Sequence, residues 1–276
     1  MENRFLRCAA CGLGQRHPVP DVAALIEMYR HTSSHEMEYP FESNAAWCRA
    51  RELLDTHLEG SQQAAVLDVG CHTGRFLAAL PEGWTRHGIE SADGPVQVAS
   101  EQHHVNVIAE RLETTDARWR NHFDAVTMFD VIEHLPDPLA GLRAAAQLVK
   151  PGGLLIVSSG DLDAWTWRWL GSEHWYLQTP QHLCVVSQRF LDYAARDYGL
   201  EQHSFMKIPH RLANRSFRWR EMIDAVHWGL RIRGGLYRGP HRLLQSIPGL
   251  GRLRHRVTVP WTMTLRDHLL ASYVRQ

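Results

Sequence analysis

The residues best suited to binding chemistry occupy one short stretch, from Val66 to Phe76. There an apolar run ends at Asp68, passes through Gly70 and Gly74, and continues into a helical apolar pattern. Glycine permits positive φ angles and removes the Cβ atoms that would keep a ligand away from the backbone. The N–H groups of such a loop, and of the helix that follows it, face the ligand. The stretch therefore predicts a strand–loop–helix unit that binds a nucleotide-like cofactor.

Two common nucleotide-binding motifs are excluded by the residues of this loop. After Gly70 come Cys71, His72, Thr73 and Gly74, which do not match the dinucleotide pattern G-x-G-x-x-G. No lysine follows at the position that a triphosphate-binding loop requires. The remaining alternatives are another nucleotide-like cofactor, or an ordinary βα turn in an unrelated α/β protein.

The bulk properties exclude several classes of protein. Thirty Lys and Arg residues balance thirty Asp and Glu residues, so the chain has no overall charge suited to nucleic acid. No apolar run reaches the 18 residues of a membrane span, and the first residues lack the apolar core of a signal peptide. Five cysteines, an odd number in a chain of 276 residues, favour reduced thiols and a cytoplasmic location.

Strand and helix patterns alternate from residue 64 onward, which is typical of a mostly parallel sheet covered by helices on both faces. Such sheets bind ligands at the carboxyl ends of their strands, near the switch in strand order. The expected strands are residues 64–69, 84–90, 105–109, 123–129, 154–158, 200–208 and 268–274, with helices at about 74–80, 94–101, 138–149 and 187–198 and a turn at 150–153.

Glu90 ends the second expected strand, twenty-two positions after Asp68. An ionised carboxylate only accepts hydrogen bonds, so an acid at this place can accept both hydroxyls of a ribose. The alternative is a solvated acid at a strand end, which the spacing from the glycine loop disfavours. Asp68 is expected to accept N–H bonds from the loop and to hold the loop in shape.

Four segments together resemble the class I S-adenosylmethionine (SAM) methyltransferases. They are Asp-x-Gly-x-His-x-Gly in the loop, F-D-A-V at 123–126, D-V-I-E-H-L-P-D-P at 130–138 and K-P-G-G at 150–153. The resemblance covers about residues 60–207. It is strongest to the subgroup of ubiquinone-type O-methyltransferases and methyltransferases of sugars and natural products. It implies a Rossmann-like α/β fold with seven strands, an N-terminal lid and a helical insertion before the last strand.

The resemblance also implies roles for residues of this chain. The glycine loop would hold the methionine part of SAM, Glu90 the ribose, and the end of the third strand the adenine, where Glu113 competes with Glu110. The residues implied in cofactor binding are Asp68, Gly70, Cys71, His72, Gly74, Glu90, Ala109, Glu110, Phe129, Asp130 and Val131, and the last three also line the acceptor pocket. His72 replaces the usual glycine, and positive φ is uncommon for other residues, although histidine tolerates it better than most.

Histidines near the acceptor pocket are candidates for the group that removes a proton from the acceptor. His182 lies in T-P-Q-H-L (179–183), which resembles the P-E-H-L segment of the sugar and natural-product subgroup. An imidazole with a near-neutral pKa suits deprotonation of a hydroxyl. His134 is the second candidate and His174 a weaker one, while a packing role is the alternative for His182. Gln181 replaces the acid of the relatives, which disfavours C-methylation.

Asp130, Glu133 and His134 form a D-x-x-E-H pattern. Some relatives hold a divalent cation with a similar E-x-x-E-H cluster, and two carboxylates and an imidazole are suitable ligands. A structural role at the loop and the next helix is preferred, so no metal ligand is assigned from the sequence.

The N-terminal stretch Cys8-Ala9-Ala10-Cys11-Gly12 resembles the C-x-x-C-G knuckle that precedes related domains. Two thiolates cannot complete a tetrahedral structural zinc site. Cys48 or His17 could complete one, but a degenerate remnant is preferred. The segment between Tyr29 and Tyr39 is expected to fold over the pocket as a lid.

Aromatic and basic residues mark two further segments. Trp165, Trp167, Trp169 and Trp175 could wall an aromatic or lipid-bearing acceptor, meet a membrane interface, or pack a flap over the sheet. Residues 210–260 contain eleven arginines and two acids. This segment could meet anionic lipids or a phosphate-bearing substrate, or form a cap whose arginines pair with the acidic remainder of the chain.

The sequence thus predicts four parts: residues 1–42, a lid with the degenerate knuckle; 43–209, a SAM-binding Rossmann-like domain; 210–262, an Arg-rich helical insertion; and 263–276, the last strand. The predicted function is SAM-dependent O-methylation of a small molecule, sugar or lipid-linked glycan. The protein is expected in the cytoplasm, with peripheral membrane contact through 210–260 as an option and no nucleic acid partner. The alternatives are a non-catalytic SAM-fold subunit that binds or regulates a partner, and N- or C-methylation of a natural product.

Overall fold

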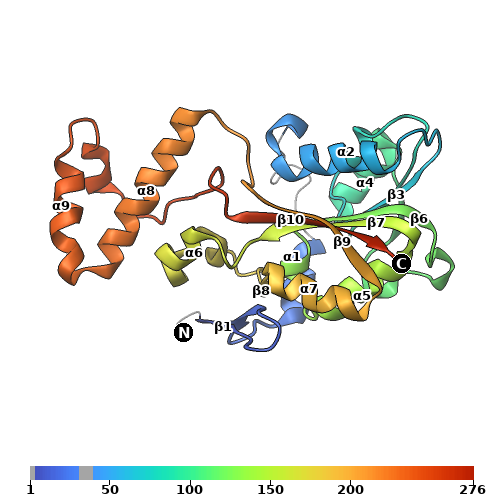
Figure 1. Ribbon diagram of the computed structural model, residues 1–276, viewed down its shortest axis with the longest axis horizontal. Coiled ribbons are helices and arrows are strands. Elements are labelled where there is room, and N and C mark those ends of the chain that lie inside the picture. Colours follow the sequence, from blue (N-terminus) through green and yellow to red (C-terminus); the bar gives the residue numbers. More distant parts are fainter. Residues whose placement is uncertain (1–3, 31–39) are drawn as a thin grey trace.

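A seven-stranded sheet forms the centre of the computed structural model, which describes residues 4–30 and 40–276 (Figure 1). The strand order is β5-β4-β3-β6-β7-β10-β9, and β10 runs antiparallel to both of its neighbours. This confirms the predicted α/β class with a mostly parallel, Rossmann-like sheet. The strands are β3 (Ala65–Val69), β4 (Thr85–Ile89), β5 (Asn106–Ala109), β6 (Phe123–Phe129), β7 (Val149–Gly160), β9 (Leu200–Ile208) and β10 (His268–Arg275).

Both faces of the sheet are buried under helices, because successive strand residues point to opposite faces and both faces are apolar. Val66 and Leu67 are adjacent in β3, yet they belong to two different hydrophobic clusters. Figure 1 shows α2 and α4 on one side of the sheet and α5 and α7 on the other. The covering helices are α2 (Ala45–His57), α3 (Arg75–Ala78) and α4 (Asp93–His103) on the first side, and α5 (Pro138–Leu148) and α7 (Gln188–Asp197) on the second.

The prediction that a turn at 150–153 precedes the fifth strand is wrong, because these residues lie inside β7. Phe123 of β6 pairs with Val149, and Ala125 pairs with Leu154. Five residues of β7 therefore correspond to two of β6, and the excess is accommodated in a bulge in which Gly152 has a φ of +79°. Glycine adopts this left-handed conformation without a Cβ penalty, so the strand is interrupted without ending.

A second, three-stranded sheet was not predicted from the sequence. It pairs β1 (Arg4–Arg7) with β2 (Gly14–His17) and β2 with β8 (Cys184–Val185), all antiparallel. The strands are only two to four residues long, too short to show the apolar alternation that marks a strand. The helical elements of this part are α1 (Val22–Arg30) and the 3₁₀ helix η1 (Phe41–Ser43). The predicted lid between Tyr29 and Tyr39 lies outside the residues whose side chains are described.

Arg16 of β2 connects this small sheet to the segment that carries His182. Its side chain is almost fully buried, and its Nε donates to the carbonyl of His182 at 2.8 Å. Its Nη2 donates to the carbonyls of Leu177 and Thr179 at 2.9 and 2.8 Å. A guanidinium with several donors in a fixed plane can hold three carbonyls at once. The N-terminal segment thereby holds the backbone at the predicted histidine and at two residues before it.

The segment between β9 and β10 projects beyond the carboxyl end of the parallel strands, with α9 farthest from the sheet (Figure 1). Its elements are α8 (Arg215–Arg233), η7 (Gly235–Tyr237), α9 (Arg238–Ser246) and η8 (Gly251–His255). Inside it, the buried Asp224 binds Arg252 and Arg256 at 2.6 and 2.9 Å. None of the described helices is long and apolar enough to cross a membrane.

Three of the four clustered tryptophans have a packing role. Trp167 and Trp175 are buried, and Nε1 of Trp169 donates to the carbonyl of Ala225 in α8 at 3.0 Å. Trp165 is 41% exposed. The segment therefore joins the projecting helices to the sheet. The helical elements not yet given are α6 (Trp165–Leu170), η2 (Leu112–Thr114), η3 (Ala117–Trp119), η4 (Ile132–His134), η5 (Gly171–Glu173) and η6 (Trp175–Gln178).

Candidate active site

The glycine loop after β3 has three residues in the left-handed region. Their φ angles are +71° for Gly70, +46° for His72 and +78° for Gly74. A Cβ on Gly70 would lie 2.5 Å from Cγ2 of Val131, so the loop touches the segment after β6. His72 therefore adopts the conformation that glycine has in the family pattern, and the loop keeps its shape with histidine at this position.

Glu90 follows β4 and faces the glycine loop directly. Its Oε2 accepts the backbone N–H of His72 at 2.9 Å, and its Oε1 accepts those of Ser91 and Ala92 at 2.8 and 2.9 Å. A carboxylate has about four lone-pair sites, so three bonds leave one site, on Oε2. Glu90 can therefore accept one ribose hydroxyl in this arrangement, and binding of both requires the release of a backbone contact.

Asp68 does not bind the loop as predicted. Its Oδ1 accepts a 2.6 Å bond from the hydroxyl of Thr127 on the neighbouring β6, while the loop N–H of His72 goes to Glu90. Burial, with a smaller effect of the Glu90 charge, raises the pKa of Asp68 to about 7 against the lowering effect of the Thr127 bond. Asp68 was expected to accept N–H bonds from the loop. Its carboxylate instead accepts the Thr127 hydroxyl and so links β3 to β6.

The side chain of Cys71 packs inside the protein, and its backbone forms part of the glycine loop. Its side chain is buried, and a Cβ on Gly88 of β4 would lie 2.4 Å from its Sγ. Burial raises the pKa of Cys71 well above its ordinary value, with smaller effects of the Asp68 and Glu90 charges. The thiol is therefore held in its protonated, unreactive form at neutral pH.

The other predicted cofactor residues lie at the same edge of the sheet. Ala109 ends β5, and its carbonyl accepts the N–H of Glu90 at 3.2 Å. Glu110 follows and is exposed. The Phe129 ring packs edge-on against Phe76 of α3, with 4.7 Å between the ring centroids. The structure thus brings the ends of β3, β4, β5 and β6 together around the glycine loop.

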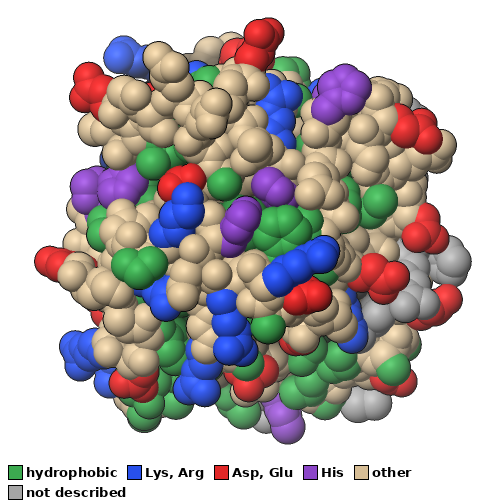
Figure 2. Space-filling view, turned by 90° about the vertical axis from the view of Figure 1, so that its right-hand side faces the viewer, with side chains coloured by type: hydrophobic (Ala, Val, Ile, Leu, Met, Phe, Trp, Pro, Cys, Tyr) green, Lys and Arg blue, Asp and Glu red, His purple; other side chains and the backbone are tan. Residues whose placement is uncertain are grey.

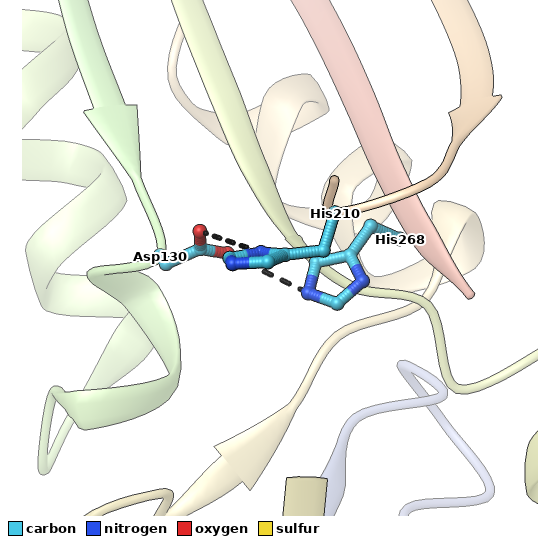
Figure 3. Close-up of side chains that lie close together, drawn as sticks. All are labelled: Asp130, His210 and His268. Carbon is cyan, nitrogen blue, oxygen red and sulfur yellow. Dashed lines mark ion pairs between the residues drawn. The ribbon is translucent and has the colours of Figure 1, made fainter. Parts of the chain in front are cut away.

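Asp130, His210 and His268 come together from three separate strand ends, as Figure 3 shows. Oδ2 of Asp130 lies 3.4 Å from Nδ1 of His210, and Oδ1 lies 3.8 Å from Nε2 of His268. Asp130 has a φ of +53°, which turns its side chain out of the line of β6. Burial alone would raise the pKa of Asp130, but the bond from His210 and the nearby imidazoles lower it to about 2.

His210 and His268 were missed as site residues. His268 starts β10, opposite Gly160 of β7 and Ile208 of β9, so antiparallel pairing places it at the carboxyl edge of the parallel strands. His210 follows the end of β9 and reaches the same edge. The available signal was a histidine two residues after the predicted strand 200–208 and another at the first residue of the predicted strand 268–274. These positions point to a shared site only when the order of the strands in the sheet is known.

The D-x-x-E-H pattern is divided between two clusters. Asp130 faces His210 and His268 in the first cluster. The second cluster contains Glu133, His134 and His182, each of which offers one nitrogen or carboxylate oxygen within 4.8 Å of the others. Among the described residues these two groups alone could supply three His, Cys or acidic ligands, and neither contains Cys8 or Cys11.

Glu133 is fully buried and held by two hydroxyls. Ser159 donates to its Oε2 at 2.9 Å, and the Tyr176 hydroxyl donates to its Oε1. Burial and the Asp130 charge raise the pKa of Glu133 to about 8, against the lowering effect of these bonds. The carboxyl is therefore mostly protonated at neutral pH and can itself donate a hydrogen bond.

Both predicted proton acceptors are neutral histidines. Nδ1 of His182 lies 2.7 Å from the Tyr176 carbonyl, and Nδ1 of His134 lies 3.2 Å from the Gln181 carbonyl. Burial lowers the pKa of His134 to about 4, and burial together with the His134 charge lowers that of His182 well below its ordinary value. A carbonyl at Nδ1 fixes the proton there and leaves Nε2 as the basic atom.

His174, the weakest of the three histidine candidates, is part of the packed interior. Its ring stacks on Trp167 with 4.0 Å between centroids. Nε2 lies 3.2 Å from Oγ1 of Thr166, and Nδ1 accepts the N–H of Tyr176 at 3.3 Å. Burial lowers the pKa of His174 to about 4. It caps η6 and supports the tryptophan segment.

Comparison with known proteins supplies the family. A family model described as a methyltransferase domain matches residues 35–204. The ubiquinone biosynthesis O-methyltransferase of Escherichia coli O9:H4 (strain HS) is 35% identical over 124 residues, which cover 42% of this chain and 52% of that protein. The corresponding protein of Citrobacter koseri is 34% identical over 124 residues, covering 42% and 51%. The chain therefore spans about half the length of the curated relatives it matches.

Solved structures share the fold at low sequence identity. The YcgJ protein from Bacillus subtilis has a TM-score of 0.52 at 14% identity, covering 83% of this chain and 99% of that one. The [4+2]-cyclase SpnF has a TM-score of 0.52 at 16% identity, covering 92% and 91%. At such identities the likeness shows the fold alone. With the family match over more than half of its residues, the chain belongs to the methyltransferase-domain family of class I SAM-dependent enzymes.

Proposed function

We propose that this protein transfers the methyl group of SAM to a hydroxyl of a small molecule, a sugar or a lipid-linked glycan. The observation that carries the proposal is the glycine loop with its three left-handed residues, of which His72 donates its N–H to Glu90, beside imidazoles and carboxylates at one sheet edge. The family match and the likeness to O-methyltransferases support it. Because the match covers only about half of the length of those relatives, the acceptor is identified by the labelling experiment below.

The loop and its surroundings fit the proposed cofactor. Gly70 is exposed, and a Cβ there would meet only Val131 within 4 Å among the described residues, so a ligand can approach its backbone closely, although its N–H already donates to the Ile89 carbonyl at 2.8 Å. Glu90 retains one acceptor site for a ribose hydroxyl, as derived above. In this proposal Ala109 and Glu110 contact the adenine. Phe129, Asp130 and Val131 lie between the cofactor and the acceptor.

When bound, SAM supplies an electrophilic methyl group, and the chain supplies position and proton acceptance. Holding two reactants in line contributes up to about 7–11 kcal/mol to lowering the barrier. His182, or His134 as second candidate, accepts the hydroxyl proton at Nε2, because Nδ1 already faces a carbonyl. Their lowered pKa values keep both unprotonated at neutral pH but make them weak bases, so the acceptor hydroxyl must be made more acidic within the site.

The cofactor assignment is tested by calorimetry of SAM binding. Glu90→Ala and Gly70→Val should each abolish measurable binding, while Glu101→Ala on the exposed face of α4 should leave the affinity unchanged. Unchanged affinity in the first two variants would refute the assignment. Labelled SAM incubated with the protein and extracts of its own cell should then label one product, whose analysis distinguishes O-, N- and C-methylation.

A non-catalytic SAM-fold subunit is the alternative from another class. The sequence feature in its favour is His72, which replaces the usual glycine of the loop, yet His72 keeps the left-handed conformation of the loop. This alternative predicts SAM binding without label transfer to any acceptor in the extract.

Peripheral membrane contact is a second proposal, and it rests on the segment 210–260. Of fourteen large hydrophobic side chains that are exposed among the described residues, nine lie there, including Leu236 (97%), Val257 (79%) and Leu243 (69%). Two of its arginines, Arg252 and Arg256, form ion pairs with Asp224 of the same segment. Exposed arginines beside exposed apolar side chains suit an anionic lipid surface.

Figure 2 views the opposite end of the molecule, where acidic, basic, histidine and hydrophobic side chains are interspersed over one face. The membrane proposal is tested by flotation with anionic vesicles. The wild type should float with the vesicles, and the double variant Leu236→Glu, Leu243→Glu should lose this binding. Absence of salt-sensitive binding by the wild type would refute the membrane proposal without bearing on methyl transfer.

A further inference from the structure

We propose that Asp130, His210 and His268 bind a divalent first-row transition-metal ion such as Zn²⁺. One carboxylate and two imidazoles form a ligand set of the kind that such ions prefer. This set differs from the D-x-x-E-H pattern, because only Asp130 belongs to both. The binding of the ion does not depend on the proposed function, whereas its effect on an acceptor does.

The separations of the three side chains suit one ion between them. Oδ2 of Asp130 lies 3.4 Å from Nδ1 of His210, and Oδ1 lies 3.8 Å from Nε2 of His268. One ligand-capable atom from each residue lies within 4.8 Å of the others. Two ligands about 2.1 Å from a zinc ion, at a tetrahedral angle, lie about 3.4 Å apart. Binding therefore needs only small side-chain movements.

Two of the facing atoms have no hydrogen-bond partner among the described residues. They are Oδ1 of Asp130 and Nε2 of His268, both shielded from solvent. His268 as a whole is 1% exposed. A buried polar atom without a partner is unfavourable, because it has lost the hydrogen bonds that water would supply. Since the two atoms point to the same place and lie too far apart to bond each other, a bridging ion would satisfy both.

A carboxylate behind His268 orients it as metal-bound histidines are oriented. Nδ1 of His268 lies 2.9 Å from Oδ1 of Asp267. Oδ2 of Asp267 accepts bonds from Thr262 Oγ1 at 2.7 Å and Trp175 Nε1 at 3.3 Å. A carboxylate at one ring nitrogen fixes the tautomer and directs the other nitrogen to the metal. The two carboxylates of Asp130 and Asp267 also match the charge of a divalent ion.

The neighbouring cluster is less suited to an ion. Both oxygens of Glu133 already accept hydroxyls, Oε2 from Ser159 and Oε1 from Tyr176, whereas Oδ1 of Asp130 has no hydrogen-bond partner among the described residues. The cluster at Asp130 therefore offers the better site.

The site adjoins the glycine loop through Val131, which follows Asp130 and contacts Gly70. Three protein ligands leave coordination positions for an acceptor oxygen. Binding to the ion lowers the pKa of a hydroxyl. If the proposed function holds, this supplies the acidity that the weakly basic His182 and His134 require, and it favours acceptors with a second oxygen beside the methylated hydroxyl, which can chelate.

The site is tested by titrating the full chain with Co²⁺, whose visible absorption reports its coordination, and by calorimetry with Zn²⁺. We expect one tight equivalent in the wild type. Asp130→Asn and His210→Ala should each remove it, and Asp267→Asn should weaken it about 10–100-fold. His255→Ala and Cys8→Ala, both at exposed positions outside the cluster, should retain it. No tight equivalent in the wild type, or an equivalent that survives both ligand variants, would overturn the proposal.

SAM binding, measured in the same variants, separates this proposal from the proposed function. His210→Ala should bind SAM as the wild type does while losing the metal, with an unchanged melting temperature as evidence of folding. A wild type that binds SAM but no metal refutes the metal site alone. A wild type that binds metal but no SAM refutes the cofactor assignment alone.

Discussion

The backbone N–H of His72 donates a 2.9 Å hydrogen bond to Oε2 of Glu90. His72 occupies the position at which the family pattern has glycine, and its left-handed backbone, with a φ of +46°, directs this N–H towards the carboxylate. The bond joins the loop after β3 to the end of β4. It gives the unusual residue a defined place in the pocket and fixes the loop before any ligand binds.

Replacing His72 tests whether its backbone or its side chain matters. His72→Gly should bind SAM within about threefold of the wild type, because glycine adopts positive φ readily. His72→Val should lose about 1–3 kcal/mol of stability relative to His72→Gly, since a β-branched residue is strained there. Urea denaturation of both variants measures the difference. A large loss of SAM affinity in the glycine variant alone would instead show that the imidazole contacts the cofactor.

Asp68 should make stability depend on pH. Its pKa is about 7 in the folded protein, whereas an unfolded Asp has a pKa of about 3.9. The unfolded chain therefore loses this proton first, and stability falls as pH rises from about 4 to about 7, by up to about 1.4 kcal/mol per pH unit. Asp68→Asn removes this effect.

Denaturant unfolding of Asp68→Asn and wild type at several pH values measures it. The stability advantage of the variant should grow between pH 4 and 7 and stay constant above. An advantage independent of pH would contradict the raised pKa. The remaining pH dependence of the variant belongs to other groups, among them Glu133, whose raised pKa acts in the same direction.

The contact of Gly88 with Cys71 predicts a coupled pair. A Cβ at residue 88 would lie 2.4 Å from Sγ of Cys71 and 3.1 Å from Cγ1 of Val105. Gly88→Ala should therefore destabilise the protein by about 1–3 kcal/mol. Adding Cys71→Ala removes the nearer atom and should recover part of the loss, which a double-mutant cycle measures. Gly239→Ala, where no atom lies within 4 Å, is the matched control.

His182 should affect turnover more than cofactor binding. His182→Ala should lower kcat about 10²–10⁴-fold, the usual contribution of a positioned proton acceptor. SAM affinity by calorimetry should change less than about twofold, and added imidazole should restore part of the rate. His203→Ala, at an exposed position of β9, should leave kcat unchanged. If melting temperature and SAM affinity fall together with activity, His182 packs against Tyr176 and has no part in proton transfer.

Local sequence patterns determined the main features of this protein. The apolar run that ends at Asp68, the two glycines and the strand-end Glu90 were sufficient to predict a cofactor loop, because strands, tight turns and helix starts depend on neighbouring residues. The alternation of strands and helices predicted the parallel sheet for the same reason. The family match extends over the same part of the chain.

The tertiary structure decided what distant residues do together. His210 and His268 became site residues because β10 is inserted antiparallel between β7 and β9, and this order is not written in any local pattern. Asp68 bonds Thr127 on the next strand instead of its own loop, and Arg16 holds carbonyls more than 160 positions away. Local residue types fix which elements form, whereas the partners of a buried polar group depend on which strand ends are packed beside it.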